Sequence, residues 1–152
     1  LIFYTSDGGN MIEIISDRKI LRISPFGRDN TPDIPEYDWI HTYVEYELPE
    51  LKTQYQASFN VGELNALKAK LRELHRSLVD GTKAREVIFD STENQLNLVF
   101  SPSSTGRGVL LTLTLRPENP AESVVVSDSL GMDESYFPAI LSGLDEIINW
   151  TS

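Results

Sequence analysis

The sequence contains no cysteine among its 152 residues. Disulfides, thiolate metal sites and a cysteine nucleophile are therefore excluded, and the absence fits a reducing compartment, so we expect a cytoplasmic protein. Histidine is scarce as well, and His41 and His75 alone leave few candidates for metal pairs or acid–base catalysis. No phosphate-loop, dinucleotide, kinase or G-x-S-x-G motif occurs. The sequence therefore predicts a protein that is not an enzyme and uses no cofactor or metal ion.

Long apolar runs are also missing, since no segment approaches the roughly 20 residues needed to span a bilayer. The start, LIFYTSDGG, lacks the basic and apolar regions of a signal peptide, so we expect neither anchoring nor export. Basic residues number 13 against 23 acidic ones, which gives a formal net charge of −10. This charge repels nucleic-acid phosphates and anionic membranes and attracts a basic protein, although it also serves solubility alone. A basic protein is therefore the expected partner, with no nucleic acid and no membrane.

The chain length predicts a single domain over residues 1–152. Segments with alternating polarity predict an opening hairpin in which IFYTS and MIEII flank DGGN, and then a strand at 19–24. The proline-rich segment from Pro25 to Pro35 indicates a loop. The strands WIHTYVEYEL and TQYQASFNV follow, and four more are expected in REVIFDS, QLNLVFS, GVLLTLTLRP and ESVVVSDS.

Two segments change from strand to helical periodicity. The first carries a leucine stripe at spacings of three and four, preceded by the capping pair Asn60 and Glu63 and closed by Gly81. Packing of this stripe against a sheet is favoured over a dimer seam, because it spans barely two heptads. The second helix is expected from Ser135 to Trp150. The leucine stripe comprises Leu64, Leu67, Leu71, Leu74 and Leu78.

The order of elements predicts an α+β fold, with an antiparallel sheet of about seven to eight strands and two main helices. We expect the protein to be a monomer or weak dimer.

The stretch DNTPDIPEYDWIHTYVEYELPE, from Asp29 to Glu50, holds seven carboxylates and neither lysine nor arginine. Alternation along its strand divides the side chains between two faces. Ile40, Thr42, Val44, Tyr46 and Leu48 are expected on one face, and Trp39, His41, Tyr43, Glu45 and Glu47 on the other. The second face combines aromatic and charged groups, a composition found in pockets and in protein interfaces.

Catalytic and ion-binding roles for these residues each have a simpler structural alternative. Glu45 and Glu47 would place their Cα atoms about 6.5 to 7 Å apart, a separation compatible with carboxylate catalysis, but no substrate pocket is indicated. A calcium loop needs denser acidic spacing around a glycine. His41 suits ordinary packing, a partner contact or, less well, catalysis, and His75 is expected to be solvated on the polar side of its helix. The loop STGRG, from Ser104 to Gly108, has anion-binding groups but is better explained as a hairpin turn.

Several of these segments together resemble the small immunity proteins of bacterial polymorphic-toxin and contact-dependent growth inhibition systems, in particular the WapI-type group. The likeness rests on the opening hairpin around a DG turn, the strand YDWIHTYVEY and the glutamine-rich strand that leads into an ELxxLxxxL helix. A run of hairpins and the closing segment DESYFPAILSGLDEII complete it. It covers most of the chain as a pattern.

The resemblance implies a protein that neutralises a secreted toxin by covering its active site or substrate surface. Many such toxins are basic nucleases, so the acidic stretch would dock on the toxin, with aromatic anchors and carboxylates that steer and pair. A dimeric acidic secretion chaperone is an alternative, although such chaperones usually begin with a helix. A small ligand-binding α+β domain is another. The predicted toxin-binding residues are Asp33, Glu36, Tyr37, Asp38, Trp39, His41, Tyr43, Glu45 and Glu47.

Overall fold

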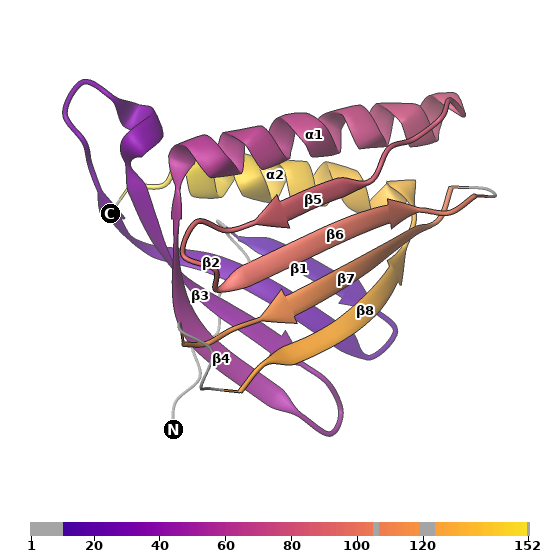
Figure 1. The fold of residues 1–152 in the computed structure, drawn as a ribbon, viewed down its shortest axis with the longest axis horizontal. Coiled ribbons are helices and arrows are strands. Elements are labelled where there is room, and N and C mark those ends of the chain that lie inside the picture. Colours follow the sequence, from indigo (N-terminus) through magenta and orange to yellow (C-terminus); the bar gives the residue numbers. More distant parts are fainter. Residues whose placement is uncertain (1–10, 105–106, 119–123, 152) are drawn as a thin grey trace.

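The chain forms two four-stranded antiparallel sheets and two helices in a computed structural model that describes residues 11–104, 107–118 and 124–151 (Figure 1). The order of elements is the same in both halves: four strands and then a helix. The first sheet and its helix comprise β1 (Ile12–Ser16), β2 (Lys19–Asp29), β3 (Trp39–Glu47), β4 (Lys52–Asn60) and α1 (Val61–Asp80). The second sheet and its helix comprise β5 (Val87–Asp90), β6 (Leu96–Pro102), β7 (Val109–Leu115), β8 (Val126–Met132) and α2 (Phe137–Ile148). Short 3-10 helices occupy Pro35–Tyr37 and Glu134–Tyr136.

This architecture confirms the predicted α+β fold with its antiparallel strands and two main helices. The strands divide between two sheets, in the orders β1-β2-β3-β4 and β5-β6-β7-β8, so each strand pairs with its neighbour in sequence. IFYTS and DGGN of the expected opening hairpin lie outside the described residues. MIEII corresponds to β1, which pairs with β2 across a turn that contains Asp17 at φ 55°.

The predicted loop from Pro25 to Pro35 is wrong in its first part, because β2 continues to Asp29. The pairing of β2 with β3 passes from Pro25 opposite Thr42 to Gly27 opposite His41, and the residue between them, Phe26, has no partner. This β-bulge lets the strand continue past a proline, whose missing N–H would otherwise break a regular ladder.

The leucine stripe of α1 is buried, as predicted, and packs within the chain. The helix begins with the expected capping box: Asn60 Oδ1 accepts a hydrogen bond of 2.7 Å from the Glu63 amide, and Glu63 Oε2 accepts one of 2.9 Å from the Asn60 amide. It ends at Gly81, whose φ of 70° suits a residue without a side chain. The two helices lie side by side, with α1 on β5 and α2 on β1 (Figure 1).

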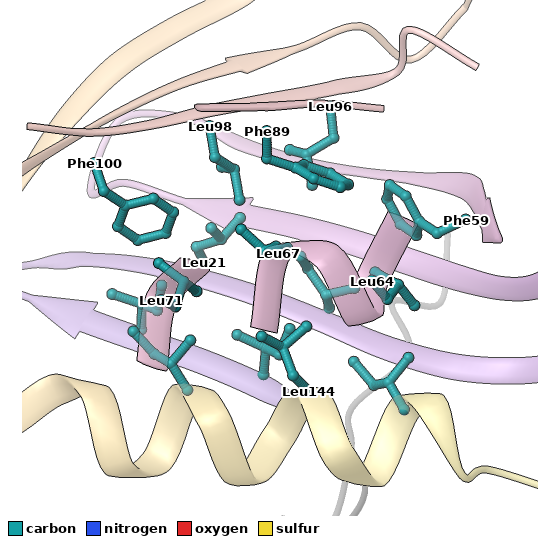
Figure 2. Close-up of a pocket in the computed structure, with 15 residues that line it drawn as sticks. Leu21, Phe59, Leu64, Leu67, Leu71, Phe89, Leu96, Leu98, Phe100 and Leu144 are labelled. Carbon is teal, nitrogen blue, oxygen red and sulfur yellow. The ribbon is translucent and has the colours of Figure 1, made fainter. Parts of the chain in front are cut away.

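The inner faces of both sheets and both helices contribute to one hydrophobic cluster. At its centre lies a cavity of about 20 Å³, lined only by apolar side chains from β1, β2, β4, α1, β5, β6 and α2. Figure 2 shows Phe59, Phe89, Leu98 and Phe100 pointing toward the leucines of α1 across this space. Organic ligands need pockets of roughly 300 Å³ or more, so this cavity cannot hold one.

Helix α2 approaches β1 closely at Gly143. A Cβ atom at this position would lie inside contact distance of the Met11 carbonyl oxygen and 3.1 Å from the Ile12 Cα. Both neighbours are backbone atoms, which cannot turn aside as a flexible side chain can. Gly143 is therefore the point at which the helix fits against the edge strand of the first sheet.

Polar groups tie the two sheets together along a seam between β8 and strands β1, β2 and β3. Asp128 accepts hydrogen bonds from Lys19 Nζ at 3.0 Å and from the Tyr46 hydroxyl at 2.5 Å. Ser16 Oγ donates to the Gly131 carbonyl at 2.5 Å. Burial alone would raise the pKa of Asp128, but the hydrogen bonds from Tyr46 and Lys19 outweigh it and lower that pKa.

Candidate protein-docking face

The outer face of the first sheet, turned away from the core, carries the alternate side chains of β3 and their neighbours on β2 and β4. Its β3 residues are those predicted from alternation, since Ile40, Thr42 and Val44 on the other side are fully buried. Register places Ser58 opposite His41 and Gln56 opposite Tyr43 on β4. We call this surface the docking face; its members are Glu13, Arg22, Ser24, Phe26, Asp29, Trp39, His41, Tyr43, Glu45, Glu47, Lys52, Gln54, Gln56 and Ser58.

Phe26 is a member of this face that the sequence did not predict. The bulge sets its ring against Tyr43, with 4.5 Å between centroids and 31° between planes, and 6.2 Å from the His41 ring. Gly27 lies under the cluster, where a Cβ atom would come within 3.3 Å of His41 Cδ2. The available signal was the sequence PFG, because a proline and a glycine close together inside a run of strand residues are typical of a bulge. Phe26 remains 39% exposed and is thus open to a partner.

His41 is held between two side chains on neighbouring strands. Its Nδ1 lies 2.7 Å from Ser58 Oγ, and its Nε2 lies 2.9 Å from Asp29 Oδ2. Serine, histidine and aspartate are the residue types of a nucleophilic triad, but a triad needs a buried carboxylate to orient the ring, and the Asp29 side chain is 75% exposed. The network fixes the orientation of the His41 ring on the face.

Glu45 lies on the predicted side of β3 but is only 4% exposed, whereas the side chain of Glu47 is 40% exposed. Glu45 Oε1 accepts a hydrogen bond of 3.0 Å from Gln54 Nε2, and Arg22 Nη1 lies 4.0 Å from its other oxygen. Burial raises the pKa of Glu45, against the opposing effect of Arg22. Arg22 also contacts Glu13 at 2.6 Å and Glu47 at 3.9 Å, so three carboxylates surround one guanidinium. Glu45 thus belongs to the floor of the face.

Asp38 is also buried, at 4% exposure, and it fastens a loop to the body of the protein. Its Oδ1 accepts a 2.5 Å hydrogen bond from the Thr31 amide, and its Oδ2 accepts two from Arg28, at 2.8 and 3.0 Å. Arg28 Nη1 also donates to the carbonyl of Ile148, the last residue of α2, and to that of Trp150 just beyond it. The hydrogen bonds from Thr31 and then Arg28 hold the pKa of Asp38 below its usual value.

Three further predicted residues lie at one rim of the face. Asp33, Glu36 and Tyr37 are exposed on the loop between β2 and β3, which projects where α1 begins (Figure 1). Strand β3 separates this rim from Glu47 by about 26 Å, the length of eight strand residues. The structure therefore places Trp39, His41, Tyr43 and Glu47 along one face of β3, with the rim next to Trp39 and far from Glu47.

Two further side chains, His75 and Lys68, make contacts within the protein. His75, expected to be solvated, is half-buried and stacks on Phe137 with 5.7 Å between centroids. Lys68 Nζ on α1 lies 2.5 Å from Asp145 Oδ1 on α2. Within the described ranges, no group of three or more His, Cys, Asp or Glu side chains is placed to hold a metal ion. In the same part of the chain, no helix is long and apolar enough to cross a membrane.

Comparisons with known proteins give one family and a set of similar folds. The model of the family described as "Immunity protein WapI-like family" matches residues 11–152. No curated protein matches the chain. The solved structure of WHY1 from Arabidopsis thaliana is similar at 14% identity and a TM-score of 0.52, over 99% of this chain and 88% of that one. WHY3 from the same plant matches at 15% identity and 0.49, over 99% and 92%, and the plant transcriptional regulator PBF-2 at 12% and 0.49, over 91% and 79%. At such identities the likeness to WHY1 concerns the fold alone.

Proposed function

The chain belongs to the WapI-like immunity protein family, and from this premise we propose that it binds a cognate secreted toxin domain and neutralises it by covering the active site or substrate surface. Immunity proteins have a toxin protein as their partner and are generally not enzymes. The proposal also states which surface of this protein contacts the toxin and which chemical groups of the toxin that surface recognises. We place the contact on the docking face of the first sheet.

The composition of the docking face is the observation that carries this proposal. Phe26, Trp39, His41 and Tyr43 lie on one surface and are partly or well exposed. Aromatic residues of this kind are enriched among the side chains that dominate binding energy at protein interfaces. Cross-strand neighbours from β4 add amide and hydroxyl groups that can hydrogen-bond to a partner. The face therefore supplies both anchors and polar contacts.

Charge supports a basic partner. The face itself carries four carboxylates and two basic side chains, and Asp33, Glu36 and Glu50 add exposed carboxylates at its two ends. Rim charges mainly speed association, while desolvated anchors slow dissociation. We propose that Glu47 and the rim carboxylates steer a basic toxin surface, and that Tyr43 and Trp39 hold it.

The proposed setting follows from this role. A protein that protects its own cell from an incoming toxin would act in the cytoplasm, as the absence of cysteine led us to expect. The chain would bind the toxin as a monomer or weak dimer. A secretion chaperone would instead bind an unfolded effector segment, so the state of the bound partner distinguishes these two functions.

The test is a binding titration with the folded C-terminal toxin domain encoded next to this gene, followed by kinetics in low and high salt. We expect a one-to-one complex in which the toxin loses activity. Tyr43→Ala should mainly speed dissociation, by about thirtyfold if Tyr43 is a hot spot. Glu47→Lys should mainly slow association. Leu110→Ala serves as the matched control, since Leu110 is 49% exposed on the second sheet.

Two results would contradict the proposal in different ways. Binding that is unchanged in Tyr43→Ala and Glu47→Lys, but weakened in Leu110→Ala, would move the interface to the second sheet. Failure of the wild-type chain to bind or inhibit the neighbouring toxin would remove the neutralising role itself. Binding to an unfolded secreted segment would support the chaperone function.

A further inference from the structure

We propose that the outer face of the second sheet binds the same face of a second copy of this protein, so that the chain forms a weak twofold dimer. This surface is not used by the proposed toxin contact. The inference rests on its composition, shape and area. We call it the self-association face; its members are Ile88, Asp90, Asn97, Val99, Ser101, Leu110, Thr112, Thr114, Ser127, Ser129 and Gly131.

The self-association face is open on the side away from the core. Strand residues that alternate with its members, such as Leu98, belong to the hydrophobic cluster, so the members point outward. Ile88 is 50% exposed and Leu110 is 49% exposed. The register sets Val99 between Ile88 and Thr112, so apolar and hydroxyl-bearing side chains cross the sheet in one row. Figure 1 shows these strands with neither helix in front of them, so a second protein can reach them.

Charge distinguishes this face from the docking face. Asp90 is its one charged member, and Asn97 Nδ2 donates to Asp90 Oδ1 at 2.6 Å. Glu86 and Arg116 lie at its borders, where they bond to Ser101 and Asn97. Two copies of a chain with a net charge of −10 repel each other, and they do so least where the contact itself adds few like charges. A basic toxin gains from carboxylates instead, so the self-association face suits a second copy better than the toxin.

Leu110 and Gly131 give the face a shape that can fit itself. They lie directly opposite each other on β7 and β8. Leu110 projects from the sheet, whereas a Cβ atom at Gly131 would meet nothing within 4 Å. In a twofold contact, each pair of touching residues occurs twice, once in each direction. Leu110 of each copy can therefore occupy the open space over Gly131 of the other copy.

The size of the face predicts a weak dimer. Strands β6, β7 and β8 have seven residues each, and β5 has four. With strands about 4.8 Å apart and a rise of about 3.3 Å per residue, the face measures roughly 20 by 23 Å, so two copies would bury about 900 Å². Stable complexes bury about 1,200 Å² or more. Pairing should therefore need high protein concentration, and it leaves one docking face free on each copy.

The experiment is sedimentation equilibrium of the full chain without toxin, over concentrations from about 10 μM to about 1 mM. We expect a monomer–dimer equilibrium with a Kd on the order of 100 μM. The dimer should become several-fold tighter as salt rises, because salt screens the repulsion between the two copies. Association with a basic toxin should respond to salt in the opposite direction.

Three variants test the geometry, and circular dichroism checks that each one folds. Leu110→Asp should weaken the dimer at least about tenfold, because it sets like charges against each other across the contact. Leu51→Asp is the matched control, since Leu51 is 45% exposed between β3 and β4 and the change in net charge is the same. It should leave the dimer in place. Gly131→Val should weaken the dimer by filling the space for Leu110, whereas an apolar surface without this fit would become stickier.

The possible results separate this inference from the immunity function. A chain that stays monomeric at about 1 mM, a dimer that loosens as salt rises, or a Leu110→Asp protein that pairs like wild type would overturn the self-association face. A tighter dimer in Gly131→Val would refute the fit of Leu110 over Gly131. Toxin binding that weakens in Leu110→Asp but not in Leu51→Asp would assign this face to the toxin instead. Loss of the dimer alone leaves the immunity function standing.

Discussion

Reversing the charge of Glu45 should lower the stability of the folded protein. The same change at Glu47, two residues further along β3, should mainly affect binding. The side chains share one face of β3, and alternation alone treats them as equivalent. Burial separates them, because Glu45 is 4% exposed and the side chain of Glu47 is 40% exposed. The pair therefore tests which carboxylates belong to the fold and which to the interface.

The magnitude follows from the position of Arg22. Its Nη1 lies 4.0 Å from Glu45 Oε2, a separation at which two unit charges interact by about 4 kcal/mol at an effective dielectric constant of 20. Glu45→Lys turns this attraction into repulsion, and a flexible lysine can relieve part of it by turning outward. We expect a loss of about 3 kcal/mol, which lowers Tm by roughly 6–12 °C in a chain of this length. Glu47 lies just as close to Arg22, at 3.9 Å, but its side chain is 40% exposed, so water screens the pair and Glu47→Lys should change stability by less than about 1 kcal/mol.

Thermal unfolding followed by circular dichroism measures the first effect, and stopped-flow association with the toxin domain measures the second. Glu47→Lys should slow association most at low ionic strength and least at high, since salt screens exposed charges. Equal Tm shifts in the two variants, or a Glu45→Lys protein as stable as wild type, would refute the assignment of Glu45 to the floor of the face.

Two further predictions concern stability. The hydrogen bonds from the Thr31 amide and Arg28 lower the pKa of Asp38, so its contribution is present above the unfolded pKa of about 3.9 and is lost as pH falls through the lower folded value. Between pH 5 and 2, urea unfolding should thus show a smaller loss of stability for Asp38→Asn than for wild type, and parallel curves would contradict this. Gly143→Ala should lower stability by about 1–2 kcal/mol despite its better helix propensity, because a methyl group there meets the backbone of β1. Ser142→Ala, exposed on the same helix, is the control and should raise Tm slightly.

Local patterns were sufficient to predict most elements. The capping pair, the leucine stripe and the glycine that ends α1 act within a few residues of one another, so the sequence displays them directly. The alternation of β3 and β4 likewise follows from burial of every second side chain. The division into two sheets could not be predicted, because a strand alternates in the same way whichever sheet it joins.

The site was harder to predict, because burial of a polar side chain depends on partners elsewhere in the chain. Asp38 is buried with Arg28, and Glu45 is buried beside Arg22. Both arginines lie on β2, and only the β2–β3 register brings them next to these carboxylates. Phe26 was missed because Pro25 and Gly27 led us to expect a loop, whereas pairing with β3 keeps this segment in the strand through a bulge. Composition alone treated all seven carboxylates of the stretch as one surface.

The sequential pairing of the strands has a consequence for the order of folding. Each ladder closes across a connection between neighbouring strands, whereas the bond from Lys19 to Asp128 joins residues 109 positions apart. The entropy lost on closing a loop grows with its length, and proteins rich in local contacts fold fastest. We therefore expect the seam between the sheets to form last and to open first. The docking face lies wholly on the four strands between residues 12 and 60, and these are synthesised before any strand of the second sheet.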